Sequence, residues 1–382
     1  MRILLCLHHY LDPNQGAPGV TLALGQALEV AGCEVEYFGF DHAFPKTGSK
    51  AIGNSVRFPW RLASFLSHEA GNFDVIDIST GDAWVWGMRK RPSAKGVHAL
   101  ITRSHGLEHI MDQQRRSFSR DTGQRLSWKY PLYHGGYRLW EVQQSIRISD
   151  HSIMLNDEDK KFVSAALGVS GKKVSVLPHA IADVFHQATP VTSLMDGTLR
   201  LAYIGNWLPM KGVHVLVDAA SRLGERNMQF TLSLYGTGQD ADVIRGHFPP
   251  RVRDRVRVIP RYQSGDLPSL LAEEQVLLFP TLSEGFGLAL FEAMACGLVP
   301  VTTPLGGAST VIQHGINGIF VPLNDSKAMA QAVCAFDDDR NMLWQMRRRA
   351  QESVDYYRWN NIAAETIALY NSVLRKKLEV SG

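Results

Sequence analysis

The chain opens with a short apolar strand, a loop, an amphipathic helix and a second strand, and this order restricts it to folds built on parallel sheets. The apolar run 3–7 predicts the first strand, 20–31 predicts the helix, and 33–38 predicts the second strand. Further short apolar runs, typical of buried parallel strands, lie at 75–78, 99–102, 152–155 and 174–177. We therefore expect a doubly wound domain over residues 1–187.

The same alternation of strands and helices begins again near residue 199. Its predicted strands are the runs LRLAYIG, FTLSLYG, RVRVI, VLLFP and VPVTT, with helices at 213–223 and 287–295. The stretch 179–198 is polar, contains proline and has no period, which is typical of a linker. The predicted fold class is α/β, with two doubly wound domains and ligands bound in the cleft between them.

Charge and cysteine content exclude several classes of protein. The chain carries 40 Lys and Arg against 37 Asp and Glu, and the net charge of +3 is too small to indicate a nucleic-acid partner. Its four cysteines are scattered without a CxxC pair, so neither a disulfide framework nor a zinc site is expected. The first apolar run is too short for a signal peptide, and no run of 18 apolar residues occurs. We therefore expect a cytoplasmic protein.

The stretch 280–301, PTLSEGFGLALFEAMACGLVPV, carries the most informative motif. A strand ends at Pro280, the glycine-rich loop 283–287 follows, and a helix then runs to a natural terminating glycine. Free backbone N–H groups and the positive end of a helix meet there, which suits a phosphate. Two carboxylates, those of Glu284 and Glu292, flank this predicted phosphate site. A carboxylate can accept hydrogen bonds from the hydroxyls of a sugar. The spacing alone leaves open that these glutamates have no such role.

As a whole, this stretch resembles the signature S-E-G-F-G-x(4)-E-A-M-A-x-G of the retaining GT-B glycosyltransferases of family 4. The ten matching positions are Ser283, Glu284, Gly285, Phe286, Gly287, Glu292, Ala293, Met294, Ala295 and Gly297. The resemblance implies the GT-B fold, in which two Rossmann-like domains face each other across a cleft. An acceptor would bind the first domain, residues 1–187, and a nucleotide sugar the second, residues 198–355. A C-terminal helix within 356–382 would return to the first domain.

The resemblance also implies which residues are catalytic. Glu284 would contact the transferred sugar, and His105, after the strand 99–102, looks like the active-site histidine of the family. Gly16 and Gly19 would belong to a glycine loop after the first strand, a pattern that is weak by itself and is usually a turn.

The donor-binding residues follow from the same resemblance. Glu292 would hold the ribose hydroxyls of the donor. Backbone N–H groups for the phosphates would come from Phe286, Gly287 and Leu288. The other donor-binding positions would be Gly16, Gly19, Gly205, Asn206, Lys211, Gly236, Arg261, Tyr262 and Gly285. The family uses neither a metal nor a bound cofactor, because the nucleotide sugar is a co-substrate.

Residues 205–212 depart from the family pattern. Family members usually read G-R-x(4)-K-G here, and this chain reads GNWLPMKG. Lys211 matches and would contact the donor phosphates, whereas neutral Asn206 replaces the arginine. One of two cations at the diphosphate is therefore missing. Arg261 stands where glycine is common, and it either supplies the lost charge or is solvated.

The acidic run 157–159 superficially resembles the metal-binding DxD of a different class of glycosyltransferase. It follows a strand and precedes two lysines, so we interpret it as the start of a helix capped by Asn156 or Asp157. The pair His8 and His9 has no metal-ligand spacing, and no metal site is predicted.

Residues 111–147 interrupt the alternation with seven basic side chains and interleaved aromatic ones. One interpretation is a solvated amphipathic pair of helices. The other is a lid that binds the acceptor or faces an anionic membrane, which would place the protein at the inner membrane face. The acceptor partner would then be a carbohydrate or a lipid-linked molecule.

The predicted function is transfer of a hexose from a nucleotide-diphosphate sugar to an acceptor hydroxyl with retention of configuration. No carboxylate is an obvious covalent nucleophile, so the departing phosphate would take the acceptor proton in a same-face displacement. Two alternatives stay open. One is a disaccharide phosphorylase on the same fold, and the other is a non-catalytic protein that binds nucleotide sugars.

Overall fold

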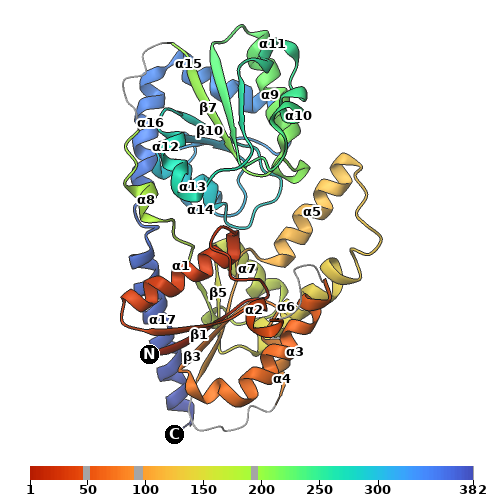
Figure 1. The fold of residues 1–382 in the computed structure, drawn as a ribbon, viewed down its shortest axis with the longest axis vertical. Coiled ribbons are helices and arrows are strands. Elements are labelled where there is room, and N and C mark those ends of the chain that lie inside the picture. Colours follow the sequence, from red (N-terminus) through yellow and green to blue (C-terminus); the bar gives the residue numbers. More distant parts are fainter. Residues whose placement is uncertain (46–51, 90–97, 191–196, 382) are drawn as a thin grey trace. The chain divides into compact units, whose positions relative to one another are not determined.

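The structure, a computed structural model, describes residues 1–45, 52–89, 98–190 and 197–381 (Figure 1). The chain divides into two compact units. Unit 1 consists of Met1–Ala180 together with Trp359–Gly382, and unit 2 consists of Ile181–Arg358. Part of the predicted linker, 191–196, lies outside the described residues.

Unit 1 is built on a parallel sheet of six strands in the order β2-β1-β3-β4-β5-β6. The strands are β1 Arg2–Cys6, β2 Glu34–Phe38, β3 Val75–Ser79, β4 Ala99–Arg103, β5 His151–Met154 and β6 Val174–Val176. Each predicted strand is confirmed, with its ends shifted by at most one residue. The chain runs from β1 to β2 on one side of it and then crosses back to β3 on the other side. The switch point of this sheet therefore lies between β1 and β3.

The helices of unit 1 cover this sheet. They are α1 Gly16–Val30, α2 Phe40–Ala43, α3 Ile52–Glu69, α4 Trp84–Met88, α5 Glu108–Thr122, α6 Arg138–Ile148, α7 Asp157–Ala166 and α17 Trp359–Ser381. The predicted glycine loop is wrong in one respect, because Gly16 and Gly19 lie in the first turn of α1. A Cβ atom on Gly19 would lie 2.5 Å from the Pro13 carbonyl oxygen, so this position requires glycine for a close approach.

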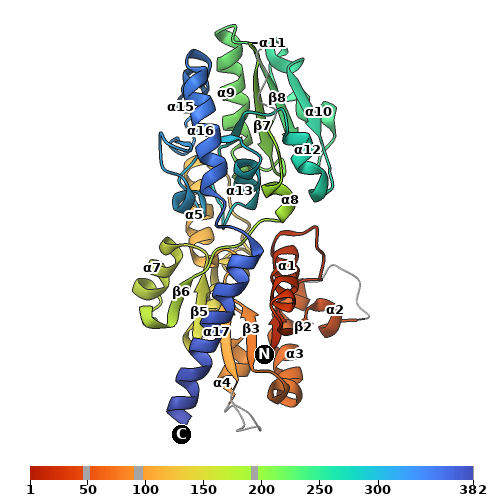
Figure 2. The same ribbon diagram turned by 90° about the vertical axis from the view of Figure 1, so that its left-hand side faces the viewer.

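The last helix, α17, lies within the predicted range 356–382 and packs against α1 and β4 of unit 1 (Figure 2). Its apolar residues Ala363, Tyr370 and Val373 join the core beneath the sheet. The buried Arg103 guanidinium donates to Asp77 at 2.9 Å and to the Tyr370 hydroxyl at 3.2 Å, and that hydroxyl donates to Asp77. A polar network within the core therefore joins α17 to β3 and β4.

Unit 2 contains a second parallel sheet of six strands, in the order β12-β11-β10-β7-β8-β9. The strands are β7 Leu199–Ile204, β8 Phe230–Tyr235, β9 Val256–Ile259, β10 Val276–Phe279, β11 Val299–Thr302 and β12 Ile319–Phe320. Five of them were predicted, and the two-residue β12 was not. The switch point lies between β7 and β10.

The helices of unit 2 follow the predicted alternation. They are α8 Asp183–His186, α9 Val213–Glu225, α10 Ala241–Gly246, α11 Pro250–Arg253, α12 Leu267–Leu271, α13 Leu288–Ala295, α14 Ala308–Val311, α15 Ser326–Asp338 and α16 Arg340–Ser353. Helices α9 and α13 each follow a strand at the switch point. They therefore present their first turns at the edge of the sheet where ligands bind in such folds.

Candidate active site

Three loops meet at the switch point of unit 2. The loop after β7 contacts the loop after β8, since the Trp207 N–H donates to the Thr237 carbonyl at 3.0 Å. It also contacts the loop after β10, since the Leu282 N–H donates to the Met210 carbonyl at 2.8 Å. Gly212 adopts φ +69°, and a Cβ atom there would lie 1.9 Å from the Pro280 carbonyl oxygen. These loops therefore fit together only with glycine at 212.

The glycine-rich loop 283–287 leads directly into α13. Gly287 is the N-cap in a left-handed conformation, with φ +85°, and Leu288 is the first helical residue. The Phe286 ring stacks on Phe291 at 4.3 Å, and the Phe286 carbonyl accepts the Gly307 N–H at 3.0 Å. These contacts hold the loop in place at the start of α13. The Leu290 N–H donates to the Gly287 carbonyl at 2.8 Å, and the start of a helix, where other N–H groups have no partner within the helix, suits an anion.

A predicted donor residue and a predicted catalytic residue form an ion pair across the switch point. Lys211, after β7, donates through Nζ to Glu284 Oε2, after β10, at 2.7 Å. Both side chains are partly exposed, with 28% of Lys211 and 13% of Glu284 accessible. The pair presents one cation and one carboxylate beside the start of α13. These are the groups needed to bind a phosphate and a hydroxyl at adjacent positions.

Glu292 lies in the second turn of α13 and is partly buried. Burial raises the pKa of its carboxyl group to about 7. Among the described residues it has no hydrogen-bond or ion-pair partner. The pKa of Tyr262 and that of Cys296 are both raised to about 12, mainly by burial and secondly by the charge of Glu292. The effect of this charge indicates that both side chains lie near the carboxylate. A carboxylate without a partner is suited to accept hydrogen bonds from a ligand.

The remaining donor residues of unit 2 lie around the same loops. Gly236 has φ +74°, and a Cβ atom on it would lie 3.0 Å from the Tyr262 ring. The Asn206 side-chain oxygen lies 3.4 Å from the Cβ position of Gly238, in the same loop as Gly236. Arg261 is exposed next to Tyr262. Unit 2 therefore brings together the predicted donor residues from β7, β8, β9 and β10.

The predicted histidine, His105, belongs to unit 1 and follows β4. Its ring stacks on His179 at 5.3 Å between centroids. Burial and the charge of Arg103 lower the pKa of His105 to about 3, so the imidazole is neutral. Its buried Nδ1 atom has no hydrogen-bond partner within the described ranges. A neutral imidazole with a free nitrogen can serve as a hydrogen-bonding group for a ligand.

Unit 1 contains a second polar cluster, around Arg138, that the sequence analysis did not predict. Arg138, at the start of α6, is 6% exposed, so the interpretation of 111–147 as a solvated helix pair is wrong for this residue. It donates to Asp82 at 3.0 Å and to the Thr80 carbonyl at 2.8 Å, and it pairs with Glu108 at 3.3 Å and Glu141 at 3.5 Å. The run Thr80-Gly81-Asp82 directly after a strand was the sequence signal that could have indicated this cluster.

The interpretation of 157–159 as a helix start is confirmed. The Asn156 side chain accepts the Asp159 N–H at 2.8 Å and caps α7. Among residues 1–45, 52–89, 98–190 and 197–381, no three His, Cys, Asp or Glu side chains converge as metal ligands would.

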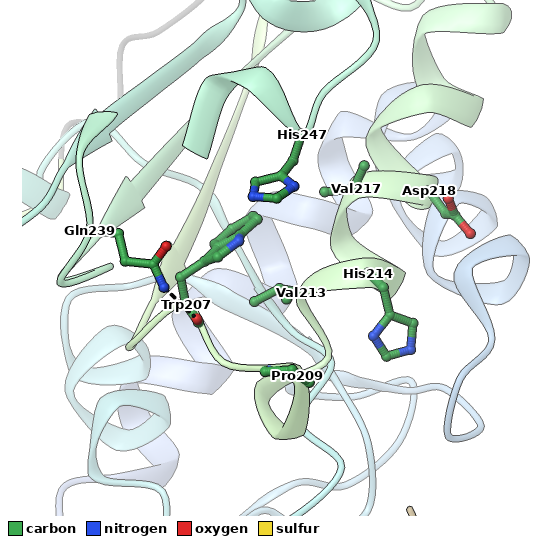
Figure 3. A pocket seen from close by; sticks show the side chains of 8 residues that line it. All are labelled: Trp207, Pro209, Val213, His214, Val217, Asp218, Gln239 and His247. Atoms are coloured by element: carbon green, nitrogen blue, oxygen red, sulfur yellow. Dashed lines mark hydrogen bonds between the residues drawn. The ribbon is translucent and has the colours of Figure 1, made fainter. Parts of the chain in front are cut away.

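A cavity of about 460 Å³ lies beside the loop after β7 (Figure 3). Trp207 stands at its centre, next to the His247 ring at 5.8 Å, and the Trp207 carbonyl accepts from Gln239 at 3.2 Å. The other lining residues are Pro209, Val213, His214, Val217 and Asp218. Glu284, Glu292 and Lys211 do not line it, so the predicted site residues and this cavity are different features of the unit.

A stretch of unit 2 matches a known protein family. Residues 198–339 match the family model described as glycosyl transferases group 1. The chain is 26% identical over 251 residues to the D-inositol 3-phosphate glycosyltransferase of Kribbella flavida. The aligned part is 62% of this chain and 59% of that protein, so the chain spans less than two thirds of its relative.

Solved structures share the fold over nearly the whole chain. Sucrose-phosphate synthase of Thermosynechococcus elongatus superposes with a TM-score of 0.76 at 18% identity, covering 98% of this chain and 99% of the other. The Anabaena protein HepE, solved in complex with UDP and glucose, superposes with a TM-score of 0.69 at 17% identity, covering 97% and 100%. The predicted GT-B architecture is confirmed by these neighbours. Residues 198–339 of this chain thus match the family model of the group 1 glycosyltransferases, and the whole chain shares its fold with these solved structures.

Proposed function

We propose that the protein transfers a hexose from a nucleotide-diphosphate sugar to an acceptor hydroxyl, with retention of configuration and without a metal or bound cofactor. The observation that carries the proposal is the Glu292 carboxylate on α13, which has no hydrogen-bond or ion-pair partner among the described residues. The N-cap of this helix, Gly287, lies beside the Lys211–Glu284 pair, since its Cβ position is 3.2 Å from Glu284 Cγ. A ribose would supply hydroxyls to Glu292, and a diphosphate would lie at Lys211 and the N–H groups. The family match supports the same assignment.

The proposed chemistry follows from charge. As the bond between sugar and phosphate breaks, negative charge grows on the leaving diphosphate, where Lys211 and the start of α13 stabilise it. A phosphate that binds Lys211 draws the ammonium away from Glu284, whose carboxylate then accepts sugar hydroxyls. His105 of unit 1 would hydrogen-bond to the transferred sugar. In a same-face displacement the departing phosphate takes the acceptor proton.

The two alternatives remain distinguishable. A disaccharide phosphorylase has no ribose to bind, so it would leave Glu292 without a role. A non-catalytic binding protein is favoured by Asn206, which is neutral where the family has a cation, but it would not need the Lys211–Glu284 pair.

A thermal-shift screen with UDP, GDP, ADP and their sugars tests the proposal. A true donor at about 100 times its dissociation constant should stabilise the protein by about 2.7 kcal/mol. Transfer, hydrolysis and phosphorolysis are then assayed with the stabilising sugar labelled. Absence of stabilisation by every nucleotide and nucleotide sugar would overturn the proposal, whereas phosphate-dependent cleavage of a disaccharide would favour the phosphorylase.

Replacing Glu292 with alanine is expected to weaken binding of the donor sugar by about 10- to 150-fold, because a hydrogen bond to a charged group contributes about 1.5–3 kcal/mol. Because burial raises the pKa of Glu292 to about 7, wild-type affinity should rise with pH from about 6 to 8 as the carboxylate ionises. The sugar hydroxyls donate hydrogen bonds to the ionised carboxylate of Glu292, so binding favours that form and the affinity increases with pH.

Calorimetry with the intact nucleotide sugar measures both effects, since its diphosphate does not titrate in this range. Glu292→Gln keeps the shape and loses the ionisation, so its affinity should be independent of pH. An unchanged affinity in Glu292→Ala would contradict the ribose assignment.

We also propose that the acceptor is reached at an anionic membrane surface on the cytoplasmic side. None of the helices within the described ranges is long and apolar enough to cross a membrane. In unit 1, however, exposed apolar side chains accompany the basic ones of 111–147. They are Trp60, Trp128, Leu132 and Trp140, with 52%, 75%, 66% and 40% of their surface accessible. Lys129 lies over the Trp128 ring at 5.4 Å, a combination suited to lipid headgroups.

Cosedimentation with anionic liposomes is therefore expected at low salt and should be lost at high salt. The double substitution Trp128→Ser and Leu132→Ser should weaken it at least tenfold. Trp344→Ser, in the exposed part of α16 in unit 2, is the matched control and should bind as the wild type does. Absence of binding at low salt would leave an acceptor free in solution as the better interpretation.

A further inference from the structure

The cavity beside the loop after β7 is formed entirely by residues of unit 2 (Figure 3). Its volume of about 460 Å³ falls within the range of small-molecule sites, about 300–1,000 Å³. One wall is the first two turns of α9, which contribute Val213, His214, Val217 and Asp218. The other wall consists of the loop residues Trp207 and Pro209, together with Gln239 ahead of α10 and His247 directly after it.

Trp207 brings a hydrogen-bond donor without a partner to this cavity. Only 7% of its surface is accessible, yet its Nε1–H has no acceptor among the described residues. The indole packs against Tyr203 at 6.2 Å and Phe248 at 6.0 Å between ring centroids, which fixes its orientation. In Figure 3 its Nε1 edge faces Val213 and Val217 across the cavity. A buried indole N–H usually has an acceptor, and a ligand in the cavity would supply one.

Two histidines add polar groups to the walls. On the α9 side, His214 Nε2 lies 3.0 Å from the side-chain oxygen of Asn324, which can only accept, so this nitrogen carries a proton. On the opposite side, the His247 ring lies 5.8 Å from the Trp207 indole. Neither nitrogen of His247 has a partner within the described ranges. An imidazole can donate and accept, so both walls offer groups that bind hydroxyls.

The charge of the lining excludes anionic ligands. In the described part of unit 2, the residues that line the cavity include neither lysine nor arginine, and they include one carboxylate, that of Asp218. This carboxylate has no hydrogen-bond or ion-pair partner among the described residues. A phosphate here would lose water without gaining a cation and would meet a charge of its own sign. The nucleotide proposed to bind at Lys211 is therefore not a suitable ligand of this cavity.

The remaining lining is apolar. Pro209, Val213 and Val217 present aliphatic surface between the polar groups, next to the edge of the Trp207 indole. A ligand that matches this lining combines C–H groups with several hydroxyls and carries no charge. A sugar ring has this composition, because its hydroxyls both donate and accept while its C–H groups pack on aliphatic and aromatic side chains.

We propose that this cavity is a second carbohydrate site, which binds an uncharged sugar unit separately from the donor residues. One sugar hydroxyl accepts the Trp207 Nε1–H, and others bond to His247 and Asp218. Lys211 and Glu284 pair with each other and do not line the cavity. The site goes beyond the proposed transfer reaction, since its ligand carries no nucleotide.

Saturation-transfer NMR on the full chain tests the proposal. The probes are the methyl α-glycosides of glucose, galactose and mannose, together with maltose, which carry no diphosphate and so are not donors. At least one probe should bind, with a dissociation constant in the millimolar range. The nucleotide that stabilises the protein most should not displace it, because the two ligands bind at different places.

Two substitutions remove polar atoms and keep the rings. Trp207→Phe removes the indole N–H and should weaken binding of the best probe by about 2- to 12-fold, the loss of one neutral hydrogen bond. His247→Phe should have an effect in the same range, and the double variant should bind at least about fivefold more weakly than the wild type. Trp344→Phe, at an exposed tryptophan of α16 in the same unit, is the matched control and should bind as the wild type does.

The donor site is tested separately with Glu292→Ala, which should bind the sugar probe as the wild type does. Loss of probe binding in this variant, or displacement of the probe by the nucleotide, would assign the sugar to the donor residues and overturn the proposal. A folded double variant that binds within twofold of the wild type would also overturn it, as would absence of binding by every probe. If no nucleotide sugar stabilises the protein, the proposed function fails, and the probe titrations still decide whether the cavity binds a sugar.

Discussion

Replacing Arg138 with alanine is expected to destabilise unit 1 by about 3–5 kcal/mol, because removing one partner of a buried ion network leaves the others without compensation. The guanidinium is the cation that Asp82, Glu108 and Glu141 share. It also lies against Gly81, where a Cβ atom would approach it to 2.5 Å. The substitution therefore leaves both buried charge and an unfilled volume.

Urea unfolding monitored by tryptophan fluorescence measures this loss, since most of the tryptophans belong to unit 1. Arg120→Ala, an exposed arginine on α5, is the matched control and should change stability by less than about 0.5 kcal/mol. Adding Glu141→Gln to Arg138→Ala should recover part of the loss. A loss below about 1 kcal/mol would show that water or protons already compensate these carboxylates.

Replacing Lys211 with alanine is expected to lower turnover by about 10²–10³-fold, the loss that follows removal of one group stabilising a developing negative charge. This loss should exceed that of Glu292→Ala, whose ribose contact is equally strong before and during bond cleavage. Turnover of the donor at saturating concentration separates the two effects.

Two further variants interpret the result. Lys211→Arg keeps the charge and should retain more activity than Lys211→Ala. Lys161→Ala, an exposed lysine on α7, should leave turnover unchanged. Turnover near the wild-type value in folded Lys211→Ala would assign the phosphate to another cation, with Arg261 the first to test.

The strands were predictable to within one residue because a parallel strand buried on both faces is a short, continuous apolar run. Val276–Phe279, which is apolar and buried at every position, is an example. The start of α1 was not predictable in this way, because GAPG has the composition of a turn. Proline near a helix start replaces an N–H that has no partner, so Gly16–Gly19 can be helical. The strand β12 has only two residues and no detectable pattern.

The candidate residues of the two units differed in how far the sequence predicted them. In unit 2 the loop, its helix and both glutamates are contiguous, so one motif carries them. In unit 1 the cluster is assembled from distant segments, since Arg138 lies 56 positions from Asp82 and 130 from His8. Only the folded sheet brings these strand ends together. An arginine in a segment rich in basic residues gave no local sign that it would be buried.

The packing of α17 has a consequence for how the chain is made. Residues 1–180 of unit 1 leave the ribosome before unit 2, yet Tyr370 and the other core residues of α17 follow after all 178 residues of unit 2, Ile181–Arg358. At about 5–20 residues per second, that delay is roughly 10–40 s. During this time the surface of α1 and β4 that α17 later covers is exposed to solvent, and Asp77 and Arg103 lack the Tyr370 hydroxyl as a hydrogen-bond partner. Unit 2 can complete its fold while this surface is still exposed, so unit 1 is synthesised first but completes its fold last. Its uncovered core is where a nascent-chain chaperone would be needed.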